Sequence, residues 1–299
     1  MKYAFIQRHL EIWPISIQCS VLGVSTRGFH DYVLRQKSTP AIGVQVGRVH
    51  DMALLAHIKA IHAETRGAYG WPRIWRELRH RGILVGKERV RRMMKVNGIR
   101  ARSKRKYKAT TDSNHGLPVC DNLLNRDFSP REPDQVWTGD ITYIPTDEGW
   151  LYLAVVIDLF SRQVVGWAMG ERMTRHLVMD ALAMAWFRRR PAPGLIFHSD
   201  QGSQYASADF QVLLGRYAMK GSMSRKANCW DNAVTETLFG SLKVERLHGC
   251  RFLTRRQAKD EVMDWMIFYN QKRLHSALGY KTPMAFEQDW RRHQQQMAA

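Results

Sequence analysis

The chain has few cysteines and no long apolar run. Its 299 residues include four cysteines, which lie far apart and form no C-x-x-C pair: Cys19, Cys120, Cys229 and Cys250. This spacing predicts reduced thiols in a cytosolic protein and argues against a disulfide framework or a zinc site. No stretch approaches the roughly 18 apolar residues of a membrane-spanning helix, and the first residues lack the apolar core of a secretion signal. We therefore expect no membrane partner.

Acidic residues are scarce in the first part of the chain. Residues 1–110 hold 23 basic and 6 acidic residues, a net charge of +17, whereas the remainder is nearly balanced at +2. A segment this basic binds polyanions by neutralising phosphates, and nucleic acid is the commonest such partner. The length allows two or three domains of ordinary size. We expect a basic DNA-binding region followed by a separate domain.

Two helical units are predicted in the basic region. The first, assigned to residues 1–48, has an apolar helical face from Ile15, a break at Gly23 and a second short helix capped by Ser25 or Thr26. This is helix-turn-helix spacing, although any helical hairpin with a glycine turn has it. The second unit, residues 49–108, has predicted helices near 51–64, over 72–81 and within KERVRRMMKV.

Basic side chains of the second unit are candidates for phosphate contact. Between residues 72 and 108 there are 15 basic and 2 acidic residues, whereas a solvated charged face mixes the two signs. Val90, Met93 and Met94 are predicted to face inward, which turns their basic neighbours toward solvent or DNA. The predicted DNA-binding residues of this unit are Lys87, Arg89, Arg92, Lys95, Arg102, Lys104, Arg105 and Lys106.

The periodicity changes after a linker at residues 109–134. Three strands in series, QVWTGDITYIP, WLYLAVVIDLF and QVVGWAMG, predict an antiparallel meander. A helix over TRHLVMDALAMAWF, a short buried strand LIFHSD and helices near 207–218 and 231–246 follow. The order β-β-β-α-β-α predicts an α/β layered domain with a mixed sheet, assigned to residues 135–250, with a helix and an arm at 251–299.

Three carboxylates have notable positions in this domain. Asp140 falls in the first strand, Asp200 ends the fourth strand before a turn, and Glu236 lies on an apolar helical face. Each has an ordinary explanation by itself, since turn aspartates and solvated helical glutamates are common. Asp158, inside the second strand, could be mistaken for the first of them. A hydrolase triad using His198 is not favoured because no G-x-S-x-G elbow is present.

Several sequence blocks, taken in order, resemble one known family. They are WTGDITYI, VIDLFSRQVVGW, HSDQGSQY, NCWDNAVTETLFGSLKVE and YNQKRLHSALGYKTPMAFE, preceded by GAYGWPRIWRELRHRGILVGKERVRRMM. They look like the second reading-frame product of bacterial transposases of the insertion sequence three family, whose catalytic core belongs to the retroviral integrase superfamily. Thirty-five residues separate Asp200 from Glu236, the spacing of the D,D-35-E signature. The resemblance extends from about Ile15 to Trp290.

The resemblance implies a ribonuclease H-like fold and a DNA transposase that cuts and joins strands by a copy-out, paste-in route. Asp140, Asp200 and Glu236 would be the catalytic residues and would hold two Mg²⁺ ions, or Mn²⁺ as a substitute, with Asp140 bridging. Lys243, close to two helical turns after Glu236, would touch DNA phosphate, although a solvated helix end would look the same. Asp158 is then structural.

The implied partners are double-stranded DNA, as terminal repeats and target, and further copies of the chain, because acting on two ends requires at least a dimer. Active family members normally gain an upstream helix-turn-helix and a leucine zipper by frameshifting, and no sustained heptad occurs here. The upstream product, or a fusion with it, is therefore a further candidate partner. A cytoplasmic, nucleoid-associated bacterial protein is implied.

Three questions stay open at this point. The chain could be a DNA-binding regulator of transposition that does no chemistry. It could also be a ribonuclease H-superfamily nuclease that cuts without joining. In the C-terminal arm, Asn270, Arg273 and His275 either contact DNA or pack against the core.

Overall fold

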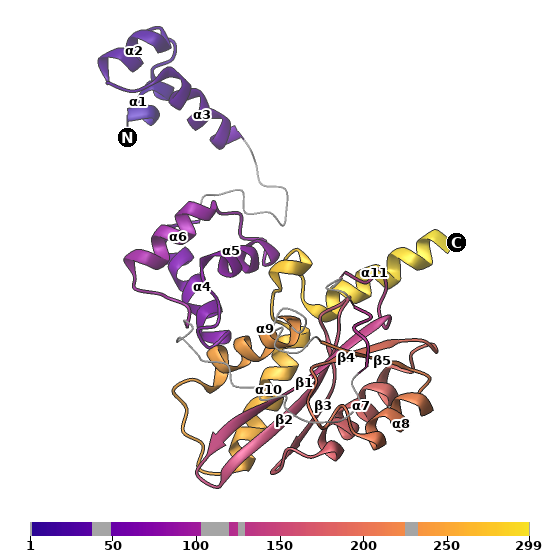
Figure 1. Ribbon diagram of the computed structural model, residues 1–299. Helices are drawn as coiled ribbons and strands as arrows, with labels where there is room; N and C mark the ends of the chain where they lie inside the picture. Colours follow the sequence, from indigo (N-terminus) through magenta and orange to yellow (C-terminus); the bar gives the residue numbers. More distant parts are fainter. Residues whose placement is uncertain (1, 38–48, 103–119, 125–128, 225–232, 299) are drawn as a thin grey trace. The chain divides into compact units, whose positions relative to one another are not determined.

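The structure is a computed structural model that describes residues 2–37, 49–102, 120–124, 129–224 and 233–298. The chain divides into two compact units, Met1–His50 and Asp51–Ala299. The second unit contains a group of three helices and the α/β domain (Figure 1). Within the described residues, no helix has both the length and the apolar character needed to cross a membrane.

Three short helices build the first unit: α1 (Lys2–Arg8), α2 (Ile15–Val21) and α3 (Thr26–Lys37). Their small core consists of Ile6, Cys19 and Phe29. Gly23 turns the chain between α2 and α3 with a φ of +60°, and the Ser25 hydroxyl accepts a hydrogen bond from the Gly28 N–H at 3.0 Å. The predicted break and cap are therefore present. Helix α1 was not predicted, and its one buried side chain, Ile6, makes it depend on packing.

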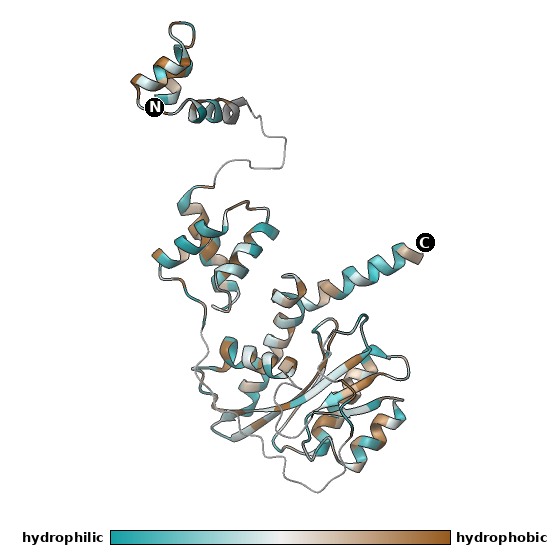
Figure 2. Ribbon diagram, turned by 45° about the horizontal axis from the view of Figure 1, so that its top comes forward, coloured by the Kyte–Doolittle hydropathy of each residue, from teal (hydrophilic) through white to brown (hydrophobic). Residues whose placement is uncertain are grey.

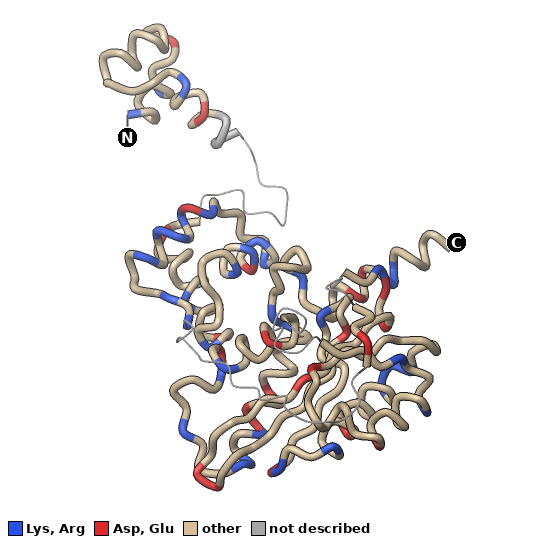
Figure 3. The backbone as a smooth tube through the Cα atoms, viewed as in Figure 1, with Lys and Arg blue, Asp and Glu red and all other residues tan. Residues whose placement is uncertain are grey.

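Three further helices begin the second unit: α4 (Asp51–Glu64), α5 (Trp71–His80) and α6 (Lys87–Val96). Each buries one apolar stripe, and the side chains involved are Leu54, Ile58, Ile61, Ile74, Leu78, Val90 and Met94. Pro72 stands in the first turn of α5, where its missing N–H costs nothing, and Gly82 ends that helix with a positive φ. Lys and Arg residues are spread along these helices (Figure 3).

The α/β domain contains a five-stranded mixed sheet in the order β3-β2-β1-β4-β5. The strands are β1 (Val136–Thr146), β2 (Gly149–Asp158), β3 (Val164–Gly170), β4 (Ile196–Ser199) and β5 (Lys220–Met223). The first three form the predicted antiparallel meander, and β4 and β5 add in parallel. Strand β5 was not predicted, because KGSM carries only one strongly apolar residue.

Helices cover both faces of the sheet (Figure 1). Helices α7 (Arg175–Arg189) and α8 (Ala208–Arg216) share a core with one set of strand side chains, including Trp137, Ala154 and Phe197. Helices α9 (Ala233–Leu242) and α10 (Arg255–Gln271) pack on the opposite face. Strand β2 is buried from both sides, so it reads as a continuous apolar run, and Figure 2 shows hydrophobic residues along the strands.

Strand β3 lies directly against α7 at Gly166. A Cβ atom there would stand 2.3 Å from the Ala181 carbonyl oxygen and 2.7 Å from the Ala185 nitrogen. Both are backbone atoms, which a rotamer change cannot move aside. Glycine is therefore required for the two elements to approach this closely.

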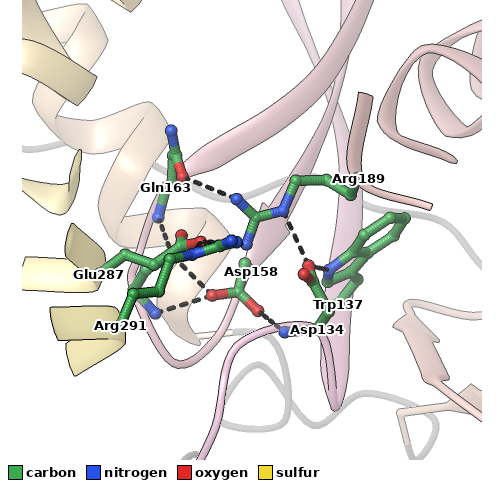
Figure 4. A network of polar contacts seen from close by, with 8 residues as sticks. Asp134, Trp137, Asp158, Gln163, Arg189, Glu287 and Arg291 are labelled. Carbon is green, nitrogen blue, oxygen red and sulfur yellow. Dashed lines mark hydrogen bonds and ion pairs between the residues drawn. The ribbon is translucent and has the colours of Figure 1, made fainter. Parts of the chain in front are cut away.

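A second helix, α11 (Pro283–Ala298), follows where an arm was predicted. Its Glu287 is 4% exposed and receives the guanidinium groups of Arg189 at 2.8 Å and Arg291 at 2.6 Å. Arg189 also donates to Asp134, whose own N–H donates to Asp158 (Figure 4). This buried network fastens α11 to the ends of β1, β2 and α7.

Candidate active site

Asp140 and Asp200 lie side by side where two parallel strands separate. Strand β1 pairs with β4 in a register that sets Val136 opposite Ile196 and Thr138 opposite His198. Continued by two residues, this register brings Asp140 level with Asp200, on strands spaced about 5 Å apart. Strand β4 ends at Ser199, so the two carboxylates stand at its carboxyl end beside an uncovered stretch of β1. Ligands of α/β sheets bind in such crevices.

Local hydrogen bonds hold both aspartates. Asp140 Oδ1 accepts from the following N–H, that of Ile141, at 2.7 Å. Asp200 Oδ1 accepts from the Gly202 N–H at 3.0 Å, which makes the tight turn predicted from the sequence. Because both carboxylates are half-buried, they sit in a medium where charge is costly.

The third acid, Glu236, comes from helix α9, which packs against β1 on the sheet face opposite α7 and α8. Glu236 stands in the first turn of α9 and is exposed, and its neighbour Thr235 is fully buried. The Thr235 and Thr138 hydroxyls share a hydrogen bond of 3.1 Å. This contact fastens the start of α9 to β1 two residues before Asp140. The helix is therefore anchored next to the two aspartates.

The three carboxylates influence one another electrostatically. Burial raises the pKa of Asp140 well above its usual value, and the charges of Asp200 and Glu236 raise it further, against the Ile141 hydrogen bond and the charge of Lys243. Burial also raises the pKa of Glu236. Burial, and then the charges of Asp140 and Asp200, raise the pKa of the Tyr205 phenol. The site concentrates negative charge that a cation would relieve.

Carboxylate oxygens are the donors that Mg²⁺ and Mn²⁺ prefer, so the donor chemistry fits a hard divalent cation. Among the described residues, however, no three His, Cys, Asp or Glu side chains lie close enough together to share an ion. The strand register brings the two aspartates together although their charges repel, while Glu236 stands on the neighbouring helix. The site therefore consists of two adjacent aspartates, with Glu236 on a helix anchored beside them.

Lys243 turns toward the same site. Helix α9 ends at Leu242 and continues as a single wider π turn, Lys243–Leu247, closed by the His248 N–H bonding to the Lys243 carbonyl at 2.8 Å. The Lys243 ammonium lies 5.4 Å from the centre of the Tyr143 ring. Burial lowers the pKa of Lys243, while Tyr143 and the charge of Asp140 oppose the shift. The stretch from Glu236 to Leu242 is regular helix, as predicted, whereas the prediction of one helix near 231–246 missed the π turn at its end.

Asp158 has the contacts of a structural residue. It is fully buried and accepts hydrogen bonds from the Asp134 N–H at 2.9 Å and from the Ser161 N–H and hydroxyl at 2.8 and 2.6 Å (Figure 4). These contacts close the turn between β2 and β3. His198 is fully buried, and its Nδ1 lies 2.9 Å from the hydroxyl of Ser222, which is buried as well; this burial argues against a hydrolase triad open to substrate.

The predicted DNA-binding residues fall into three groups. Lys87, Arg92 and Lys95 are exposed on α6. Arg89 differs, because its side chain is only 15% exposed and forms an ion pair with Asp51 that joins α6 to α4. Arg102 donates to the Glu245 carbonyl at 3.1 Å. The remaining three, Lys104, Arg105 and Lys106, lie outside the described residues.

The C-terminal residues pack against the core. The Asn270 amide donates to the Val164 carbonyl at 2.9 Å and accepts from the Val164 N–H at 3.0 Å, which caps the edge of β3. Arg273 is buried against Glu245, and His275 is packed edge-on to Tyr269. Of the two alternatives that the sequence left open, the structure favours packing. Glu245 was missed entirely, because a glutamate in the alternating stretch SLKVERL gives no signal of burial.

Comparison with protein-family models identifies the class of both domains of the second unit. The family model for an HTH-like domain matches residues 50–107, and models for an integrase core domain match residues 130–229 and 217–283. The α/β domain is therefore an integrase core of the ribonuclease H-like kind, as predicted. Among solved structures, the HTLV-2 integrase catalytic core domain in complex with magnesium is similar to this chain. The match covers 52% of this chain and 98% of that one, with 21% sequence identity and a TM-score of 0.43.

Two relatives match almost from end to end. The insertion element IS600 uncharacterized 31 kDa protein of Shigella sonnei is 45% identical over 282 residues, which cover 94% of this chain and 100% of that protein. The transposase InsF for insertion sequence IS3A of Escherichia coli (strain K12) is 43% identical over 289 residues, 96% of this chain and 98% of that protein. The chain belongs to the IS3 family of insertion-sequence transposases, which confirms the resemblance of its motifs.

Proposed function

We propose that this transposase cuts DNA at the ends of its element and joins the freed 3′ ends to another phosphodiester, using Asp140, Asp200 and Glu236 as its catalytic acids. The observation that carries the proposal is the parallel register of β1 and β4, which sets two aspartates side by side, with the third acid on a helix anchored through Thr138 and Thr235. Phosphoryl transfer needs positioned charge at this point and no covalent enzyme intermediate.

Asp140, Asp200 and Glu236 would hold two divalent cations, Mg²⁺ or Mn²⁺. When bound, the cations would supply activation of the attacking oxygen and neutralisation of the leaving 3′ oxygen. The protein's own part is to hold the aspartates at a fixed spacing, through the Ile141 and Gly202 hydrogen bonds. Rotation of the exposed Glu236 side chain then brings the third carboxylate to the pair.

Lys243 and the helical region would hold the DNA. The Lys243 ammonium lies 5.4 Å from the centre of the ring of Tyr143, which is on the same strand as Asp140, so we expect it to bind a phosphate beside the acids. Exposed Lys87, Arg92 and Lys95 on α6 would contact phosphates further along the duplex. Arg89 takes part in an ion pair with Asp51, while the exposed Arg102, which donates to the Glu245 carbonyl, stays a proposed phosphate contact.

The active form would contain at least two copies of the chain, because two element ends must be brought together. The product of an upstream reading frame, or a fusion with it, is a further proposed partner. Binding should fall steeply with salt, since phosphate contacts release counterions.

Labelled duplexes taken from the DNA that flanks the reading frame would test the proposal. The full chain is incubated with them and Mg²⁺ or Mn²⁺, beside Glu236→Gln and the matched control Asp260→Asn, an exposed acid on α10 paired with Arg256. We expect cut and joined products with the wild type and the control, and none with Glu236→Gln. Cut products that are never joined would identify a nuclease instead. Binding without product in every protein would leave either a regulator or a core that needs its upstream half, and repeating the assay with the fusion would decide between them.

A further inference from the structure

One buried carboxylate stands directly behind the catalytic helix. Glu245, 4% exposed, lies in the π turn two residues after Lys243. Its oxygens accept from Arg273 Nε at 2.9 and 3.0 Å, from the same guanidinium's second nitrogen at 2.7 Å, and from the Trp265 indole N–H at 3.1 Å. This is a two-pronged arginine–carboxylate pair with an additional donor, so the orientation of Glu245 is determined on every side.

Arg273 holds the chain on both sides of Lys243. The nitrogen that donates to Glu245 also donates to the Ser241 hydroxyl, in the last turn of α9, at 3.1 Å. The side chains of residues 241 and 245 therefore face the same guanidinium, that of Arg273, which lies just after the end of α10. In a helical turn, the residue midway between them points to the opposite side. That side is where Lys243 lies, near Tyr143 and Asp140.

The same carboxylate meets the helical group that begins the second unit. Arg73 of α5 places a guanidinium nitrogen 3.8 Å from Glu245 Oε1, and Arg102 donates to the Glu245 carbonyl at 3.1 Å. Tyr69, just before α5, donates to the Lys272 carbonyl at 3.0 Å and accepts from the Leu274 N–H at 2.7 Å. The Tyr69 hydroxyl therefore binds the backbone of the residues immediately before and after Arg273. Glu245 is thus the point at which the HTH-like domain meets the helix carrying Glu236.

We propose that Glu245 is a positioning residue for strand transfer, which with Arg273 sets the π turn so that Lys243 points at the reacting phosphate and which joins the HTH-like domain to the catalytic helix. The inference rests on the proposed function of Lys243. It predicts that loss of the Glu245 charge acts on DNA through Lys243. A residue that merely stabilises the fold would act independently of Lys243.

The chain offers a closely matched control in Glu287. It is also a glutamate that is 4% exposed, and it also receives two guanidinium groups, those of Arg189 and Arg291. It lies on α11 in the network of Figure 4, which includes no residue of α9 or of the π turn. Comparing the two glutamates separates the effect of losing a buried carboxylate from the effect of losing this one.

The test is a double-mutant cycle in the full chain with Glu245→Gln, Lys243→Ala and their combination, measured well below the lowest melting temperature. The first readout is the strand-joining rate. The second is the slope of log Kd against log salt for duplex binding in EDTA, which needs no catalysis. Lys243→Ala should lower this slope by about one phosphate equivalent.

We expect Glu245→Gln to slow joining about tenfold or more, since small displacements in an active site cost this much, and to lower the salt slope as Lys243→Ala does. The double variant should be no worse than Lys243→Ala alone. Glu287→Gln should lower the melting temperature, yet leave both the joining rate and the slope within about twofold of the wild type.

Additive losses in the double variant, together with an unchanged salt slope for Glu245→Gln, would overturn the inference. If Glu245→Gln fails to fold, Arg273→Lys replaces it in the cycle. Lysine keeps the charge but cannot reach both Ser241 and Glu245 with one planar fork, so the same coupling is expected. If the wild type joins no DNA, the proposed function fails, while the salt slopes still decide the role of Glu245.

Discussion

Two aspartates on neighbouring strands should respond in opposite ways to the same isosteric change. Asp140→Asn should abolish strand transfer and leave the fold intact or more stable. Asp158→Asn should leave the chemistry intact and weaken the fold. The contrast tests which of the two is the first catalytic acid, a question that their similar apolar surroundings leave open in the sequence.

The cost at Asp158 follows from counting donors. Its carboxylate accepts from the Asp134 N–H and from the N–H and hydroxyl of Ser161, all in a buried turn. Asparagine has a single acceptor oxygen, so at least one of the two N–H groups would face an amide NH₂ without a partner. A buried unsatisfied donor costs about 1–3 kcal/mol. Burial also raises the pKa of Asp158, so losing the charge itself costs less, and we expect a loss of about 2 kcal/mol.

At Asp140 the same substitution is expected to raise the free energy of unfolding instead of lowering it. Burial and the charges of Asp200 and Glu236 raise its pKa, which means that the folded state disfavours its ionised form at neutral pH. Asparagine keeps an acceptor for the Ile141 N–H and removes the charge. A group whose pKa is raised on folding destabilises the folded state when it is ionised, so Asp140→Asn should increase the free energy of unfolding in metal-free buffer at pH 7.

Urea unfolding at pH 7 in EDTA, followed by tryptophan fluorescence, would measure both stabilities, and the labelled-duplex assay would measure joining. The reasoning is refuted if Asp158→Asn abolishes joining at unchanged stability while Asp140→Asn remains active, because the roles would then be exchanged.

Other consequences can be measured with the same two assays. Gly166→Ala should lower the free energy of unfolding by about 1–3 kcal/mol, because the added Cβ meets the backbone of α7. Gly215→Ala in α8 has open space around it and should raise the free energy of unfolding by about 0.5–1 kcal/mol. Equal effects of the two substitutions would contradict the packing argument. Burial, and then nearby arginines, lower the pKa of His275 from 6.5 to about 4. The unfolded chain therefore binds a proton that the folded chain does not, and wild type should lose about 3 kcal/mol of stability as pH falls from 6.5 to 4, a loss absent in His275→Gln. Lys95→Ala should weaken duplex binding and lower its salt slope at unchanged melting temperature, whereas Arg89→Ala should lower the melting temperature at unchanged slope.

Long periodic segments made most of the fold predictable. The meander, α7 and the buried strand before Asp200 follow from alternation and helical periodicity, and the sheet is mixed as expected. The missed elements are those whose stability comes from partners distant in sequence. Strand β5 is a four-residue segment held by β4, and α11 is held through Glu287 by Arg189.

The same reason explains the site. Asp140 and Asp200 could be singled out from strand ends and motif spacing, and their adjacency needed only the parallel register. The packing of Asn270, Arg273 and His275 could not be predicted, because a polar side chain after a helix looks the same whether it meets DNA or a buried carboxylate. Charge alone also could not separate Arg89, which pairs with Asp51, from its exposed neighbours.

The π turn at Lys243–Leu247 has a consequence for how relatives of this chain are aligned and engineered. A π turn is an α-helix carrying one additional residue, so removing a single residue there would restore a regular helix and leave the elements beyond it in nearly the same orientation, while side chains within the turn would shift around the helix axis. The distance along the chain from Glu236 to Lys243 would be unchanged. A chain with that deletion would still carry every motif letter, yet its Glu245 counterpart would no longer face the arginine. A one-residue gap at this place in an alignment would therefore mark a change of register, with the signature itself intact.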